Sequence, residues 1–152
     1  RFKKIYSVDH LFLRGIYTSQ KRASVSQEVL SALDRYVSEG DYTLIYDNSP
    51  MLHYLTQTKP YAYNPWLYLY DKDLLQEALS RAGRERQALP VVVLQKFKGL
   101  WIDWPDGYLD DYMANDANKG KNLLINRFLY KNKYLKIWTN GYYEIWLPEY
   151  EK

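Results

Sequence analysis

The chain has 152 residues and no cysteine, and its 21 Lys and Arg against 18 Asp and Glu give a formal net charge of +3. The missing cysteines exclude disulfides, thiolate nucleophiles and cysteine-ligated zinc. The net charge is too small, and the basic residues are too dispersed, to predict a nucleic-acid-binding face. A chain of this length can bury a core without metal or disulfide staples, so we predict that residues 1–152 form a single domain.

The first residues indicate the origin of the chain. It starts Arg1-Phe2-Lys3-Lys4, without Met and without an apolar or targeting segment, which predicts that it is a piece of a larger protein. No stretch of the sequence approaches the roughly 18 to 20 apolar residues of a membrane span.

Aromatic residues are unusually abundant. They make up 17% of the chain, with 17 Tyr and 5 Trp, and many lie between residues 61 and 70. Tyr and Trp combine an apolar body with a polar tip, which suits half-buried surfaces, interfaces and sugar rings alike. Two interpretations follow: the rings cap a core with amphipathic edges, or they form a binding surface.

The first half of the chain predicts two helices around one short strand. Ser19 can cap a helix over 20–38, in which apolar residues recur at helical spacing. Residues 42–46 are β-branched and aromatic and predict a strand. A turn over 47–50 then opens a second helix, at about 51–57, and Pro50 is expected to start it.

The second half predicts a central strand and two further helices. A third helix covers 71–82, with a glycine beyond its end. The unbroken apolar run 90–95 is typical of a strand covered on both faces, so we place it at the centre of the sheet. Residues 99–121 have no clean period and predict a long loop, and a helix follows at 123–130.

The chain closes on the strongest local signal that it contains. Asn140-Gly141 separates the strand-like runs 134–139 and 142–147, which predicts a β-hairpin with a type I′ turn. Strand and helix alternate up to this hairpin. We therefore predict an α/β fold: a three-layer sandwich in which a partly parallel sheet carries helices on both faces and ends in a C-terminal antiparallel hairpin.

The first candidate site follows the strand at 42–46. Ligands of open α/β sheets bind beyond the carboxyl ends of the strands, which selects Asp47, Asn48 and Ser49, with His53 one turn into the next helix. One hypothesis is a small enzyme with a nucleophile at Ser49, although the glycines of a nucleophile elbow are missing. The competing interpretation is a helix N-cap at Ser49 or Asn48 beside a partly exposed histidine.

The second candidate site combines carboxylates and aromatic rings. It comprises Trp66, Trp101, Asp103, Trp104, Asp106 and Tyr108. Paired carboxylates are what glycoside hydrolysis requires, and aromatic rings can stack against a saccharide. The competing interpretation is that loop carboxylates act as solvated caps and turn formers. Neither an EF-hand spacing nor a multi-histidine centre is present, since His10 and His53 are the only histidines, so we predict no metal and no cofactor.

Several segments together resemble a known family. They are 13–19 (Leu-Arg-Gly-Ile-Tyr-Thr-Ser), 40–56, Lys59-Pro60 and the tail at 131–148. The arrangement resembles the soluble domain that follows the transmembrane helices in bacterial membrane proteins related to the dolichyl-phosphate-mannose protein mannosyltransferases. The matching segments are structural, and none of them is a catalytic signature.

This resemblance implies a function for the parent protein and a place for this piece. The parent would be a membrane glycosyltransferase that uses a polyprenyl-phosphate sugar, and the piece would be a non-catalytic domain on the extracytoplasmic (periplasmic) face of the cytoplasmic membrane. The domain would assist acceptor recognition or stabilise the membrane part, which would be its partner together with a glycan or polyprenyl-linked sugar. No catalytic residue carries over, because the family's catalytic acidic residue lies between membrane helices.

A different class of function stays open beside the resemblance. The chain would then be a freestanding secreted protein that binds or hydrolyses carbohydrate through its Trp/Asp-rich loop. That hypothesis uses Trp101, Asp103, Trp104, Asp106, Asp110 and Asp111.

Overall fold

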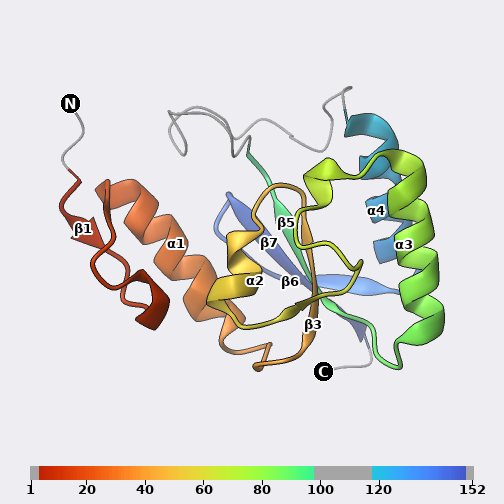
Figure 1. The fold of residues 1–152 in the computed structure, drawn as a ribbon, viewed down its shortest axis with the longest axis horizontal. Coiled ribbons are helices and arrows are strands. Elements are labelled where there is room, and N and C mark those ends of the chain that lie inside the picture. The colour runs from red at the N-terminus through yellow and green to blue at the C-terminus, as the bar shows by residue number, and fades with distance from the viewer. Residues whose placement is uncertain (1–3, 98–117, 150–152) are drawn as a thin grey trace.

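Two parallel strands form the centre of the sheet in the computed structural model, which describes residues 4–97 and 118–149 (Figure 1). Strand β3 (Tyr42–Tyr46) pairs with β5 (Val91–Gln95), in the register Thr43 to Val91 and Tyr46 to Leu94. All five residues of β5 are buried, as expected for a strand covered on both faces. The predicted central position of this strand is confirmed.

The remaining strands complete a mixed five-stranded sheet of order β4-β3-β5-β7-β6. The short β4 (Lys59–Pro60) runs parallel to β3, whereas β7 (Tyr143–Pro148) runs antiparallel to both β5 and β6 (Tyr134–Thr139). A separate ribbon of two antiparallel strands, β1 (Tyr6–Ser7) and β2 (Tyr17–Thr18), lies near the N-terminus with the short 3₁₀ helix η1 (Leu11–Leu13) between them.

Helices cover both faces of the sheet, which confirms the predicted three-layer α/β sandwich (Figure 1). On one face, α1 (Gln20–Leu33) and α2 (Met51–Leu55) pack against the side chains of Val93 and Ile145. On the other face, α3 (Lys72–Glu85) and α4 (Lys119–Lys131) pack against those of Val92 and Leu94. Alternate residues of β5 therefore serve two different cores, because successive side chains of a strand point to opposite faces.

The C-terminal hairpin is present as predicted, but its turn differs. A type I′ turn needs positive φ at both central residues, and only Gly141, with φ of +85°, has it. The side chain of Asn140 closes the turn instead, since its Oδ1 accepts hydrogen bonds from the backbone N–H groups of Tyr142 and Tyr143. The prediction of a type I′ turn is therefore wrong, although the asparagine and the glycine shape the loop.

Helix ends depart from the predicted bounds for local reasons. Ser19 caps α1 as expected, but the helix stops at Leu33, where the N–H groups of Arg35 and Tyr36 turn to carbonyls three residues back. Helix α3 runs through Gly83 to Glu85, and α4 starts at Lys119 instead of residue 123. The aromatic segment 61–70 contains a short 3₁₀ helix, η2 (Leu67–Leu69). None of the helices in the described ranges is long and apolar enough to span a bilayer.

We predict that Ile145→Ala lowers the free energy of unfolding by about 2 to 5 kcal/mol. Ile145 lies in β7 beside Val93 of β5, and its fully buried side chain belongs to the core under α1. Leu135→Ala, on the exposed part of the same hairpin, is the matched control and should cost about 1 kcal/mol or less. Urea unfolding of both variants measures the difference. Equal losses would contradict the assignment of Ile145 to the core.

Candidate functional site

The candidate site lies at the carboxyl edge of the central strands. Strands β3 and β5 are parallel, so Asp47, which follows Tyr46, and Gln95, which ends β5, come to the same edge. Asn118, at the start of α4, also reaches this edge, because its Nδ2 donates a hydrogen bond to Asp47 Oδ2 over 3.3 Å. Most of the predicted Trp/Asp site falls outside the described residues: Trp101, Asp103, Trp104, Asp106 and Tyr108, together with Asp110 and Asp111. Its proposed role stays a prediction.

Asp47 is a fully buried carboxylate that faces a buried cation. The Nζ of Lys121 lies 3.7 Å from Asp47 Oδ1, and the side chains of Lys121 and Asp47 are 9% and 0% exposed. The backbone carbonyl of Asp47 accepts a hydrogen bond from the N–H of Tyr68. Burying a carboxylate is costly unless it is paired and hydrogen-bonded, and Lys121 and Asn118 offset part of this cost.

Lys121 links the carboxylate to an aromatic segment. Its Nζ donates a hydrogen bond to the carbonyl of Tyr68 over 3.2 Å and lies 5.5 Å from the centre of the Tyr68 ring. A cation over a ring face is attracted by the ring quadrupole. The sequence interpretation missed Lys121, because it began the helix two residues later. The signal in the sequence was the spacing of residues 121, 125 and 129, which places them on one face of a helix. In the structure all three are buried.

Trp66 and Tyr68 form a stacked pair beside Asn48. Their ring centres are 6.3 Å apart with planes inclined by 27°, and Tyr68 is 41% exposed while Trp66 is half-buried. The indole N–H of Trp66 donates to Asn48 Oδ1 over 2.5 Å. The structure thus brings together Asn48 and Trp66, which the sequence had assigned to two different candidate sites.

Ser49 joins a polar network that connects the turn after β3 to strands β5 and β7. Its Oγ donates to Gln95 Oε1 and shares a 3.1 Å hydrogen bond with the Tyr143 hydroxyl, while Gln95 Nε2 donates to the Phe97 carbonyl. Burial raises the pKa of Tyr143 to about 12, so the phenol is neutral. The predicted N-cap at Ser49 or Asn48 is wrong, since Pro50 occupies the cap position of α2 and neither side chain caps it.

His53 points away from this network. Its Nδ1 shares hydrogen bonds with the hydroxyls of Thr43 at 3.1 Å and Thr58 at 3.4 Å, and Thr43 lies near the start of β3, not at its carboxyl end. The ring is 6% exposed, so the expectation of a partly exposed histidine is wrong. Asp47, Ser49 and His53 have three separate sets of partners, and this arrangement does not place a base on Ser49.

The burial of His53 gives a pH-dependent stability. Desolvation lowers its pKa from 6.5 to about 4. The unfolded chain takes up the proton first as the pH falls, so this contribution is fully present above pH 6.5 and is lost between pH 6.5 and 4.

We predict that the free energy of unfolding falls by about 2 kcal/mol more between pH 7 and pH 5 in the natural chain than in His53→Gln. Other carboxylates titrate in both proteins, and the comparison removes their effect. His10→Gln, which changes the other histidine, should keep the full pH dependence. Urea unfolding at the two pH values measures it, and a His53→Gln curve parallel to the natural one would contradict the assignment.

A second prediction concerns the buried ion pair. Lys121→Met leaves the Asp47 carboxylate buried without its cation and should destabilise the fold by about 3 kcal/mol, whereas the double variant with Asp47→Asn should recover part of the loss. Lys136→Met is the control, because the pair of Lys136 with Glu144 is more exposed and should be worth about 1 kcal/mol or less. A double-mutant cycle by urea unfolding tests the coupling. A cycle energy near zero would show that Lys121 does not stabilise Asp47.

Comparison with protein families, with curated proteins and with solved structures finds no match. Over the part of the chain that the structure describes, no group of three or more His, Cys, Asp or Glu is placed to hold a metal ion.

Proposed function

We propose that the chain is a non-catalytic accessory domain that binds a glycan, or an acceptor carrying one, at the carboxyl edge of its sheet. The parent protein would be a membrane-embedded glycosyltransferase-like protein related to the dolichyl-phosphate-mannose protein mannosyltransferases. The domain would then act on the extracytoplasmic face of the cytoplasmic membrane. The observation that carries the binding role is the stacked pair of Trp66 and Tyr68, held beside Asn48 and over Lys121.

The chemistry of this pair suits a sugar. A sugar ring has an apolar face of C–H groups and a rim of hydroxyls, and an aromatic ring beside fixed polar groups matches both. Tyr68 and Trp66 supply the aromatic surface, and the half-exposed amide of Asn48 supplies a polar group next to it. Asp47 is fully buried, so its role is to hold Lys121 and Asn118 in place and not to contact the ligand.

Restraint of the aromatic pair favours binding. Trp66 is fixed by its hydrogen bond to Asn48, and the backbone of Tyr68 is held at both ends, through its N–H to Asp47 and its carbonyl to Lys121. Groups that are already ordered lose little conformational entropy when a ligand binds.

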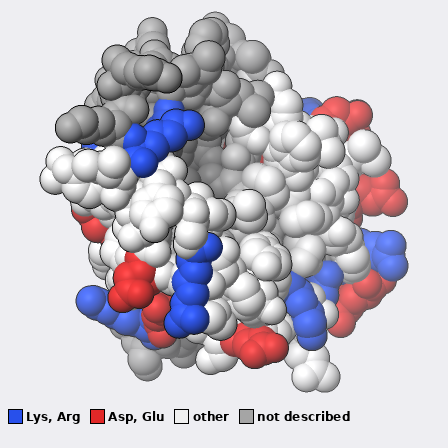
Figure 2. All heavy atoms as spheres, turned by 60° about the vertical axis from the view of Figure 1, so that its left-hand side comes forward, with Lys and Arg blue, Asp and Glu red and all other residues white. Residues whose placement is uncertain are grey.

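A second surface, rich in exposed apolar side chains, supports a role as an interaction module. Figure 2 brings forward the side with α1 and the N-terminal ribbon, where charges of both signs are scattered around broad uncharged areas. Eight large apolar or aromatic residues of the N-terminal segment and α2 are exposed: Ile5, Tyr6, Leu11, Phe12, Ile16, Tyr17, Met51 and Tyr54. The rings of Phe12 and Tyr54 lie 5.1 Å apart and connect the two segments. Exposed apolar patches often mark contact sites, and we assign this one to the membrane part of the same protein.

We predict that Trp66→Ala reduces disaccharide affinity at least tenfold, since the stacking of the sugar against the ring is lost with the side chain. Trp66→Phe keeps a ring but not the indole N–H, and should retain part of the affinity. Tyr130→Ala is the aromatic control. Tyr130 is 89% exposed and lies near the end of α4, so this variant should bind like the natural chain. Saturation-transfer NMR with glucose, mannose and galactose disaccharides measures binding.

The same experiment separates the proposal from its rivals. Binding that survives Trp66→Ala would remove the site from the carboxyl edge, and no binding by the natural chain would remove the glycan role. Cleavage of the bound disaccharide would favour a hydrolase. The reading frame upstream of Arg1 tests the proposed identity of the parent protein. We expect many membrane-spanning segments there, with an acidic residue in the first outer loop. Their absence would overturn the glycosyltransferase assignment.

A further inference from the structure

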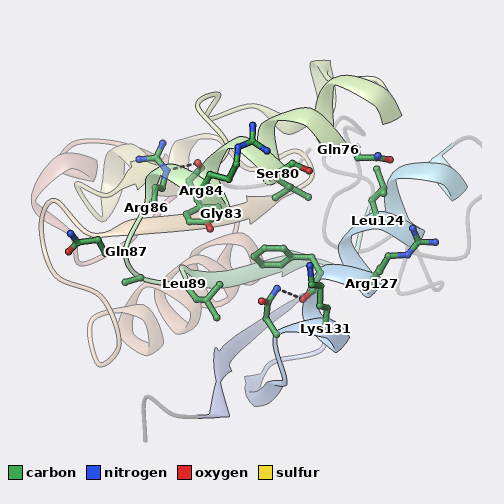
Figure 3. Close-up of a pocket in the computed structure, with 15 residues that line it drawn as sticks. Gln76, Ser80, Gly83, Arg84, Arg86, Gln87, Leu89, Leu124, Arg127 and Lys131 are labelled. Atoms are coloured by element: carbon green, nitrogen blue, oxygen red, sulfur yellow. Dashed lines mark hydrogen bonds between the residues drawn. The ribbon is translucent and has the colours of Figure 1, made fainter.

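A hollow of about 600 Å³ lies between α3 and α4, away from the carboxyl-edge site (Figure 3). It is lined by the second half of α3, by the turn that follows it and by the second half of α4. Lys121 lies near the opposite end of α4, so the hollow and the carboxyl-edge site are separate. Its volume falls in the range of small-molecule pockets, roughly 300 to 1,000 Å³.

The walls of this hollow carry a concentrated positive charge. Arg84 and Arg86 come from the end of α3 and the residue after it, and Arg127 and Lys131 come from α4 (Figure 3). None of the described residues that line the hollow is Asp or Glu. Within the described ranges, none of these four cations forms an ion pair with a carboxylate. The chain as a whole carries only +3, so this is a local excess of one sign.

The acidic residue between Arg84 and Arg86 has other partners. Glu85 lies between Arg84 and Arg86 in the sequence, but its carboxylate accepts hydrogen bonds from the Tyr63 hydroxyl and from Arg81 Nε. These two bonds hold the pKa of Glu85 below its usual range, so it stays ionised and occupied with them.

Arg86 is held in place before any ligand arrives. Its Nε donates to the Tyr61 carbonyl over 2.9 Å, and its guanidinium carbon lies 3.7 Å from the centre of the Tyr42 ring. Carbonyl and ring partners orient the guanidinium, and Glu85 acts on its charge only at longer range, without an ion pair. Arginine is the side chain best suited to planar recognition of phosphate oxygens.

The remainder of the lining is apolar or neutral. Leu79, Leu89, Leu124, Tyr61 and Phe128 provide apolar and aromatic surface, and Gln76, Ser80 and Gln87 provide neutral hydrogen-bonding groups. A small inorganic anion would use only the charges. A ligand with an anionic group and an apolar or flat part would use both parts of the lining.

We propose that this hollow binds an organic phosphate, with the phosphoryl group among Arg84, Arg127 and Lys131 and the apolar part against Leu89 and Phe128. A phosphate monoester carries about −1.5 to −2 charges at neutral pH, which suits a hollow lined by several cations better than a single carboxylate does. A soluble phosphate ester offers this monoester group, and an anionic phospholipid headgroup offers the same phosphoryl oxygens in a phosphodiester with one negative charge.

Phenyl phosphate, inorganic phosphate and phospholipid vesicles test this site. We expect phenyl phosphate to bind more tightly than inorganic phosphate in a calorimetric titration, and the affinity to fall as salt is added. Arg84→Gln combined with Arg127→Gln should lower the affinity at least tenfold. Both side chains are exposed, so this variant should fold, and its thermal unfolding checks that. Arg35→Gln, an exposed arginine in the turn after α1, removes the same kind of charge elsewhere and should leave binding unchanged.

Vesicle co-sedimentation distinguishes the two sources of phosphate. Binding to phosphatidylglycerol vesicles but not to phosphatidylcholine vesicles, lost in the double variant, assigns the site to an anionic headgroup. Binding of phenyl phosphate without vesicle binding assigns it to a soluble ester. Failure of the natural chain to bind either probe, or equal binding by the natural chain and the double variant, would overturn the proposal. Neither result depends on the glycan role of Trp66.

Discussion

The parallel pairing of β3 with β5 is the constraint on which the rest of the structure depends. Two parallel neighbours cannot be joined by a tight turn, so the chain between them must cross over, and it does so through α2, β4, η2 and α3. The pairing also buries both strands on both faces, which requires a layer of helices on each side. The three layers and the position of the candidate site therefore follow from one pairing.

The same pairing determines the electrostatics of the carboxyl edge. Asp47 directly follows a strand with four consecutive buried residues and is itself fully buried, so the carboxylate lies at the carboxyl edge of the core. Lys121 from α4 reaches it from a segment 74 positions later in the chain. A buried pair of this kind adds little net stability compared with apolar residues, but losing one partner leaves the other charge buried and disfavours any arrangement of α4 that separates them.

Elements with a strong local pattern could be predicted from the sequence. Residues 42–46 and 91–95 form strands because their β-branched and aromatic side chains suit a pleated, buried surface, and the hairpin forms around Asn140 and Gly141. The sandwich follows from the order of these elements. Helix ends were less predictable, because Gly83 is tolerated inside α3, and α4 starts at Lys119 although the side chain of its N-cap residue, Asn118, makes no capping hydrogen bond.

The candidate sites depend on contacts between distant segments, which local patterns do not encode. Asp47, Asn48 and Ser49 were found because a strand end is visible in the sequence, but the direction of His53 depends on Thr43 and Thr58. The sequence predicted Trp66 as a ligand-binding aromatic residue, but it did not predict the hydrogen bond between Trp66 and Asn48. The sequence did not predict the basic hollow, because its cations come from the ends of two helices that lie about 40 residues apart in the chain.

The contacts of Arg86 also protect one margin of the sheet. Strand β4 is the outermost strand on that side, and it has only two residues, of which Pro60 has no N–H to donate. Arg86 donates to the carbonyls of Pro60 and of the next residue, Tyr61, so these acceptors are already occupied. A strand from another molecule would find few groups there with which to pair, so growth of the sheet between molecules is blocked along β4 by a proline and an arginine.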